Sequence, residues 1–396
     1  MTPEDPSTPT SHPAAYQETA NAPESLLQTE TSTVPPVSEP AETRFLKWMV
    51  LGPDGLRVGW SVTLFLVLTI LFMIILGGIA AIFLDKGSPS RANQLSPTMA
   101  LVNEAVQFVA ILGAVAICAG IERRRILDYN LTDSRRAFHL ISGLFGGIIA
   151  LTVLIAALYW GDWIHFGPVA LSGGQILGFG TIWGIVFLLT GLVEEGSVRC
   201  YLQFTLARGI NFWWALGTVG AMCLSGLLFQ KGDGIWGVYL ISALGLIPCL
   251  WLHLSRPGNA GFWHASWATS TFFGFIHTGN GGENWIGTFA AAAIGFVFCV
   301  SIRLTGSAWW AIGFHASWDW AQTFFFGTAD SGLVAQGHYL STSPAGKILW
   351  SGGTDGPEGS LLIVPLVLLI LLGLVLVYGR KTSVKSPSTG AQPQLS

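Results

Sequence analysis

Charged residues are scarce in this chain of 396 residues, since Asp, Glu, Lys and Arg together make up 10% of it. A soluble domain carries about 25%. With a mean hydropathy of +0.56, this shortage excludes an ordinary soluble enzyme and a disordered protein. The net charge of −3 leaves no basic excess for a phosphate backbone, so we expect no nucleic acid partner. The composition is that of a polytopic membrane protein.

Paired cysteines are also lacking. The five cysteines stand in apolar runs, their number is odd, and none forms a Cys-x-x-Cys pair. They are Cys118, Cys200, Cys223, Cys249 and Cys299. Cysteine in such surroundings is a small apolar packing residue, so neither a disulfide framework nor a cysteine-based zinc site is expected.

The N-terminal segment 1–43 lacks the basic region followed by an apolar run that a signal peptide needs. The segment holds seven acidic residues, no Lys or Arg, and many Pro, Ser and Thr residues. Such a composition buries too little apolar surface to offset its ordering entropy, so we predict a disordered acidic tail over 1–43.

Long apolar runs follow the tail, and each has about the length that crosses 30 Å of hydrocarbon as a helix. Because backbone groups in lipid need internal partners, the predicted fold class is all-α, a polytopic transmembrane bundle. We expect ten spans, at 60–84, 97–120, 139–160, 175–204, 212–229, 235–253, 261–277, 285–302, 307–326 and 361–378.

The distribution of Lys and Arg tests this topology, because cytoplasmic segments carry an excess of both. With both termini cytoplasmic, 14 of the 19 basic residues fall on the inner side and 4 on the outer side. The remaining one, Arg199, lies inside a span. We therefore expect a multi-pass protein of the cell membrane with both termini cytoplasmic, an extracytoplasmic loop at 327–360, and a last helix and basic tail at 361–396.

Charges inside spans are costly and mark candidate functional sites. Glu194 and Glu195 are followed by Arg199, and Glu195 and Arg199 share a helix face at i, i+4 spacing. Glu194 stands about 100° around the helix and would project elsewhere. An uncompensated carboxylate suits a general base. A structural salt bridge with a neighbouring glutamate is the alternative.

Two further pairs have the same spacing. Phe273 and His277 place a ring and an imidazole on one helix face, and His315 and Asp319 are also one turn apart. The second pair can share a water or a metal, or the carboxylate can orient the imidazole. Each pair alone also fits a structural hydrogen bond. Three such pairs on three membrane helices are an improbable set of structural accidents.

The ordered motifs Glu-Glu-x-x-x-Arg (194–199), Phe-x-x-x-His (273–277) and His-x-x-x-Asp (315–319) resemble those of the CPBP family. This family, also called Abi, comprises CAAX proteases and bacteriocin-processing enzymes, which are intramembrane endopeptidases. The resemblance covers about 175–326, which we take as the catalytic membrane core, preceded by three N-terminal helices over 60–160. Zinc proteases of another type carry a His-Glu-x-x-His motif, which this sequence lacks.

The resemblance implies a role for each motif residue. Glu194 would activate water with help from His277, while His315 and Asp319 would stabilise the oxyanion or complete a metal site. Supporting roles fall to three residues, Glu195, Arg199 and Phe273.

Two departures from the family pattern bear on these roles. The 83-residue gap between Glu194 and His277 is longer than usual and suggests an inserted helix pair. Prenyl endopeptidases typically carry Asn at the position of Asp319. A carboxylate is a good metal ligand, so a divalent metal such as zinc could be held by His277, His315 and Asp319.

The resemblance implies hydrolysis of a peptide bond in or beside the lipid bilayer, with a membrane protein or peptide as substrate. A non-proteolytic membrane scaffold or self-immunity protein is the alternative, in which the motifs form a structural polar network. A separate polar residue, Glu104, stands near Asn103 and Gln107, and we interpret it as interhelical hydrogen-bonding glue rather than as cavity lining.

Overall fold

The computed structural model describes residues 41–52, 55–83, 94–230 and 232–379. The chain divides into two units, 1–47 and 48–396, and all three motifs lie in the second. Most of the predicted disordered tail and all of the basic tail after residue 379 lie outside the described residues, while 41–43 open the first helix.

The N-terminal part consists of long apolar helices. Its elements are α1 Ala41–Val50, β1 Leu51–Gly52, β2 Gly55–Leu56, α2 Val58–Phe83, β3 Gln94–Leu95, α3 Pro97–Glu122, the short turn η1 Ile126–Asp128, and α4 Arg136–Trp160. Helix α3 begins with Pro97 at its first turn, where the missing N–H costs nothing. It ends at Glu122, because the next residue, Arg123, has a left-handed φ of 55° that stops the helix.

The next long helix carries the first motif and is locally widened. Its parts run on without a break: α5 Gly174–Glu195, the π-helical segment η2 Gly196–Leu202, and α6 Gln203–Ala207. A second π-helical segment, η4 Trp320–Phe325, follows directly on α11 Trp309–Asp319. π-Helical turns are rare and often occur at functional sites. Each of the two begins one residue after a motif carboxylate.

The remaining helices are α7 Phe212–Phe229, α8 Ile235–Ser255, η3 Pro257–Asn259, α9 Gly261–His277, α10 Trp285–Thr305, α12 Ile348–Ser351, η5 Pro357–Gly359 and α13 Ile363–Tyr378. Asn211 and Asn284 cap α7 and α10, because each side-chain oxygen accepts a hydrogen bond from the first turn of its helix. Helices α7 and α8 stand between the first and second motifs in the chain, where the sequence suggests an inserted pair.

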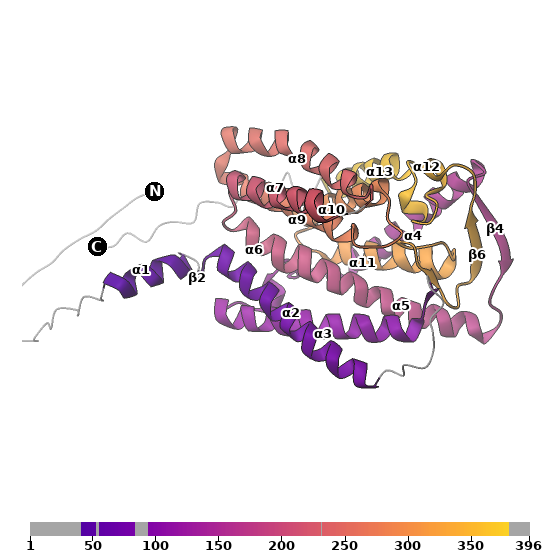
Figure 1. The fold of residues 1–396 in the computed structure, drawn as a ribbon, viewed down its shortest axis with the longest axis horizontal. Helices are drawn as coiled ribbons and strands as arrows, with labels where there is room; N and C mark the ends of the chain where they lie inside the picture. Colours follow the sequence, from indigo (N-terminus) through magenta and orange to yellow (C-terminus); the bar gives the residue numbers. More distant parts are fainter. Residues whose placement is uncertain (1–40, 53–54, 84–93, 231, 380–396) are drawn as a thin grey trace, which may run out of the picture. The chain divides into compact units, whose positions relative to one another are not determined.

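Small strands link the loops at one end of the helices. Strand β4 Ile164–Val169 pairs antiparallel with β6 Leu340–Pro344, and Figure 1 shows the two side by side. Strand β3 pairs in parallel with β5 Val334–Ala335. The region 327–360 is thus a folded connection that holds strands, α12 and η5.

Glycines let α4 and α11 approach closely. A Cβ on Gly147 would stand 2.3 Å from the carbonyl oxygen of Phe314, and one on Gly143 would stand 2.2 Å from that of Trp310. On α11, Gly313 is equally close to the backbone of Leu140. Small residues at helix contacts are the usual means of tight packing in membranes. This contact fixes the helix that carries the third motif.

The all-α membrane fold is confirmed, but the number of spans is lower than expected. Seven helices of the described part are long and apolar enough to cross a membrane, not ten: α2, α3, α4, α5 with its continuation, α7, α8 and α10. Helix α13 has only 16 residues. Helices α9 and α11 have 17 and 11 residues and carry buried Ser, Thr or His side chains. These two polar helices are the ones that hold the second and third motifs.

Candidate active site

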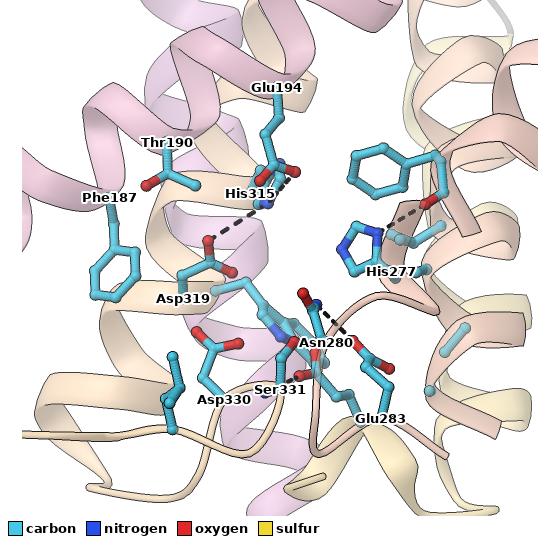
Figure 2. A pocket seen from close by; sticks show the side chains of 18 of the residues that line it. Phe187, Thr190, Glu194, His277, Asn280, Glu283, His315, Asp319, Asp330 and Ser331 are labelled. Carbon is cyan, nitrogen blue, oxygen red and sulfur yellow. Dashed lines mark hydrogen bonds and ion pairs between the residues drawn. The ribbon is translucent and has the colours of Figure 1, made fainter. Parts of the chain in front are cut away.

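A cavity of about 540 Å³ lies among the helices, and each of the three motifs contributes to its lining. Side chains of α3, α5, α9, α10, α11 and α13 line it, together with the loops after α9 and after η4. Glu194, His277, His315 and Asp319 are among the lining residues. Figure 2 shows Glu194, His315 and Asp319 on one side of the open space and His277 facing them from the other side. Side chains from three distant segments therefore meet at one cavity.

The two adjacent glutamates at the end of α5 lie in different surroundings. The side chain of Glu194 is 31% exposed and lines the cavity, whereas that of Glu195 is 0% exposed. The helix geometry predicts this divergence, since consecutive residues stand about 100° apart. Glu194 is thus accessible to a water or a substrate, and Glu195 is a buried structural carboxylate.

Glu195 connects the first motif to the third. Its Oε2 lies 3.3 Å from Arg199 Nε, and its Oε1 accepts a hydrogen bond from His315 Nδ1 at 2.9 Å. The expected Glu195–Arg199 pair is therefore present. The bond to His315 was not expected from the sequence, which offered Asp319 as the orienting carboxylate. Glu195 fixes the orientation of the imidazole from behind the cavity.

Arg199 is fully buried and is compensated by more than one partner. Besides Glu195, its guanidinium stacks over the ring of Phe273 at 4.2 Å and lies 5.8 Å from that of Phe298. Gly295 makes room for it, because a Cβ there would stand 2.1 Å from Arg199 Nη2. A desolvated cation over an aromatic ring is stabilised by about 2 kcal/mol. Phe273 therefore supports the first motif as well as the second.

His277 is the last residue of α9, and one of its ring nitrogens has a hydrogen-bond partner that fixes its protonation. Its Nδ1 lies 2.7 Å from the carbonyl oxygen of Phe273, and the two rings are 4.6 Å apart. A carbonyl oxygen only accepts, so Nδ1 must carry the proton and donate it. In the neutral imidazole Nε2 then has its lone pair free, and Figure 2 shows this nitrogen on the cavity side of the ring. His277 can accept a hydrogen bond from a water.

His315 is surrounded by carboxylates. Its Nε2 lies 3.4 Å from Asp319 Oδ2 and 3.9 Å from Glu194 Oε2, while Glu195 holds Nδ1. Asp319 thus faces the imidazole and the cavity together (Figure 2). When both its nitrogens are protonated, His315 can donate Nε2–H toward a reacting oxygen, a donation that Asp319 cannot make as a carboxylate.

Glu104 lines the cavity and also has the interhelical contact expected from the sequence. Its Oε1 accepts hydrogen bonds from Asn103 Nδ2 and Gln107 Nε2 of its own helix α3. The side chain of Thr190, on α5, hydrogen-bonds the same carboxylate. Glu104 therefore joins α3 to α5 and adds a carboxylate to the wall of the cavity.

A group of acidic loop residues at the cavity was not predicted from the sequence. Glu283, Asp330 and Glu358 line it together with Asn280 and Ser331. Figure 2 shows Asp330 and Asn280 close to Asp319 and His277, with Glu283 beyond them. The signal was weak, because these acids stand outside apolar helices, where charge is ordinary.

Hydrogen bonds hold these loops to one another. Ser331 Oγ donates to Glu283 Oε1 at 2.8 Å, and Ser331 N–H donates to Glu358 Oε1 at 3.2 Å. Asn284 N–H donates to Asp355 Oδ2 at 3.0 Å. Burial, together with repulsion from Glu283, raises the pKa of Asp355 to about 9 despite the Asn284 bond. Burial likewise raises the pKa of Glu283 and of Glu358.

The residues expected to hold zinc do not gather around one point. In the described part of the chain, one set of three metal-binding side chains brings its ligand atoms within 4.8 Å of one another, namely Glu283, Asp355 and Glu358. His277, His315 and Asp319 form no such set as they are arranged here. We therefore derive no step through a metal at these residues, and zinc assistance stays a prediction.

Comparison with known families gives one match. Residues 248–321 match the family described as type II CAAX prenyl endopeptidase Rce1-like. The matched segment contains His277, His315 and Asp319, while Glu194 precedes it. Neither the curated proteins nor the solved structures include a match to the chain. The family is one of peptidases, so the match supports protease activity in a membrane protein. Its agreement with the motifs confirms the resemblance to the CPBP family of CAAX-type proteases.

Proposed function

We propose that this chain is an intramembrane endopeptidase of the cell membrane, with both termini cytoplasmic, that hydrolyses a peptide bond of a membrane protein or peptide. The observation that carries the proposal is the meeting of Glu194, His277, His315 and Asp319 at one cavity. Apolar side chains supply part of the wall, among them Val186, Phe187, Ile294 and Ile370. An apolar stretch of wall suits a substrate segment that enters from lipid.

Glu194 acts as the general base in this proposal. It is the carboxylate of the first motif that reaches the cavity, and no Lys or Arg of the described chain forms an ion pair with it. A water between Glu194 and His277 Nε2 would lose its proton to the carboxylate as it attacks the scissile carbonyl carbon. His277 orients the water, because its protonated Nδ1 is held by the Phe273 carbonyl.

His315 stabilises the negative charge that develops on the carbonyl oxygen. Protonated at Nε2 and held at Nδ1 by Glu195, it offers a fixed donor on the same side of the cavity as Glu194. Donors held in place in advance lower the barrier, because no reorganisation is needed at the moment of reaction. Asp319 lies beside His315 Nε2 and balances its charge. Glu194 then returns the proton to the leaving amine.

The experiment is cleavage by the purified protein in lipid vesicles. A panel of membrane-inserted peptides, each with and without a farnesylated C-terminal Cys motif, is analysed by mass spectrometry for a new peptide end. We expect cleavage by the wild type and a loss of about 10²–10⁴ in rate for Glu194→Gln and for His315→Ala. Cleavage by both variants at the wild-type rate would rule out the proposed roles.

The same variants separate an enzyme from a scaffold. Glu194 is 31% exposed and its Oε2 has no hydrogen-bond partner among the described residues, so the fold should persist in Glu194→Gln. A scaffold that uses the motifs as a structural network would instead lose stability in Glu194→Gln and cut no peptide in the panel. Melting curves of Glu194→Gln and of the wild type, measured side by side, distinguish the enzyme from the scaffold.

A further inference from the structure

The acidic set Glu283, Asp355 and Glu358 consists of none of the motif residues and lies where two loops meet. Glu283 stands just before α10, while Asp355 and Glu358 stand in and beside η5, ahead of α13. One carboxylate oxygen of each lies within 4.8 Å of the others. No Lys or Arg side chain in the described ranges forms an ion pair with any of them. The three carboxylates are thus uncompensated by protein cations.

Several oxygen atoms at this place are buried without a hydrogen-bond donor. Asp355 is 0% exposed, and its Oδ1 has no partner within the described chain. The same holds for Glu283 Oε2. Gln322 is also 0% exposed and donates its Nε2 to Glu358 Oε1 at 3.2 Å, while its Oε1 has no donor. Buried acceptors without partners are costly, so these oxygens point to a ligand that supplies positive charge.

Two of the carboxylates are aimed at one point beside α10. The position that a Cβ on Gly287 would occupy lies 2.3 Å from Asp355 Oδ2 and 2.6 Å from Glu283 Oε2. Gly287 has no side chain, and this lets both carboxylate oxygens approach α10 more closely than a Cβ would allow. The convergence of the oxygens therefore depends on glycine at this position.

The kind and number of ligands favour one cation. Calcium takes six to eight oxygen ligands at 2.3–2.6 Å in a flexible geometry. Magnesium demands a near-ideal octahedron, keeps several waters and is usually bound by one or two carboxylates. Zinc prefers nitrogen and sulfur ligands, which this set lacks. Three carboxylates with oxygens within 4.8 Å of one another therefore fit calcium.

We propose that Glu283, Asp355 and Glu358 bind one calcium ion, which joins the loop after α9 to the loop before α13 at the wall of the catalytic cavity. The ion is structural and stands apart from His277, His315 and Asp319. The ion would restrain the position of His277, because the loop that carries Glu283 begins directly after His277.

The test is calcium binding by the purified full chain in detergent, with radioactive calcium for stoichiometry and thermal unfolding as a second readout. We expect one calcium ion per chain and a melting temperature that rises by a few degrees in calcium relative to EDTA. No bound calcium and no change in melting temperature at millimolar calcium would overturn the proposal.

Substitutions place the ion. Glu358→Gln and Asp355→Asn should weaken binding at least tenfold, and Gly287→Ala should do so without removing a charge. Gly281→Ala is the matched control, since a Cβ there meets nothing within 4 Å, and it should bind as the wild type does. If Asp355→Asn fails to fold, Gly287→Ala and Glu358→Gln still show whether calcium binds at this acidic set. Binding that survives in Glu358→Gln and Gly287→Ala but is lost in His315→Ala would place the ion at the motif residues and contradict the proposal.

Discussion

Removal of the buried charge on Glu195 is the perturbation whose effect is most sharply defined by the structure. Glu195 is the carboxylate that pairs with Arg199, and both side chains are 0% exposed. None of the three guanidinium nitrogens has a hydrogen-bond partner within the described residues. Glu195→Gln therefore leaves a buried cation with aromatic rings as its main support. Breaking a buried ion pair from one side costs about 3–5 kcal/mol of unfolding free energy.

A double-mutant cycle separates this pair from general damage. In Arg199→Met the charge of Glu195 keeps its hydrogen bond from His315 Nδ1, so we expect a smaller loss than in Glu195→Gln. The double variant carries neither buried charge, and replacing a buried ion pair by uncharged groups is often close to neutral. The two losses should therefore not add, and the coupling free energy should be about 2–3 kcal/mol.

The assay is reversible unfolding in mixed micelles of the wild type, the two single variants and the double variant. Glu194→Gln combined with Arg199→Met is the matched control, since Glu194 has no ion pair with Arg199, and these two losses should add. Losses for Glu195→Gln and Arg199→Met that add to within about 0.5 kcal/mol would refute the assignment of Glu195 as the partner of Arg199.

Two further predictions concern packing and pH. Gly147→Ala should lower the free energy of unfolding by about 1–3 kcal/mol, because its Cβ would meet Phe314 and Ser317 across the α4–α11 contact. Gly220→Ala is the control and should not lower it, because a Cβ there meets nothing within 4 Å. Equal melting temperatures of the two variants would refute this packing argument. Burial alone would raise the pKa of Asp133, but hydrogen bonds from Arg135 N–H, His139 and Ser307 outweigh it and lower that pKa. This stabilisation is present above the unfolded pKa of about 3.9 and is lost as pH falls through the lower folded value. Asp133→Asn should thus be less stable by about 2 kcal/mol at pH 7 and should lose that acid dependence, whereas parallel stability curves for variant and wild type would contradict the assignment.

The sequence predicted the helical membrane fold and the side chains that meet at the cavity, because lipid restricts both the backbone and the placement of charge. An apolar run of sufficient length has few structures open to it in a bilayer, and a charge such as Glu194 is rare enough there to stand out. The i, i+4 spacing likewise predicted the Glu195–Arg199 ion pair. The opposite surroundings of Glu194 and Glu195 follow from the same helical geometry.

Other features depend on contacts between distant segments, which spacing along one helix does not contain. The bond from His315 to Glu195 and the stacking of Arg199 on Phe273 join residues of different helices. The number of spans was overestimated because α9 and α11 are apolar enough to resemble spans in the sequence, although they have only 17 and 11 residues. The π-helical segment after Glu195 has no sequence signal that we recognise, and the acidic loop residues looked like ordinary loop charges.

Glu194 activates a water in the proposed mechanism instead of attacking the substrate itself. Single-turnover cleavage in water enriched in oxygen-18 tests it directly, with an excess of enzyme over peptide. If Glu194 is a base, the label enters the new carboxylate of the peptide product in that first turnover. An unlabelled product together with label in the side chain of Glu194 would show a covalent acyl intermediate and contradict the mechanism.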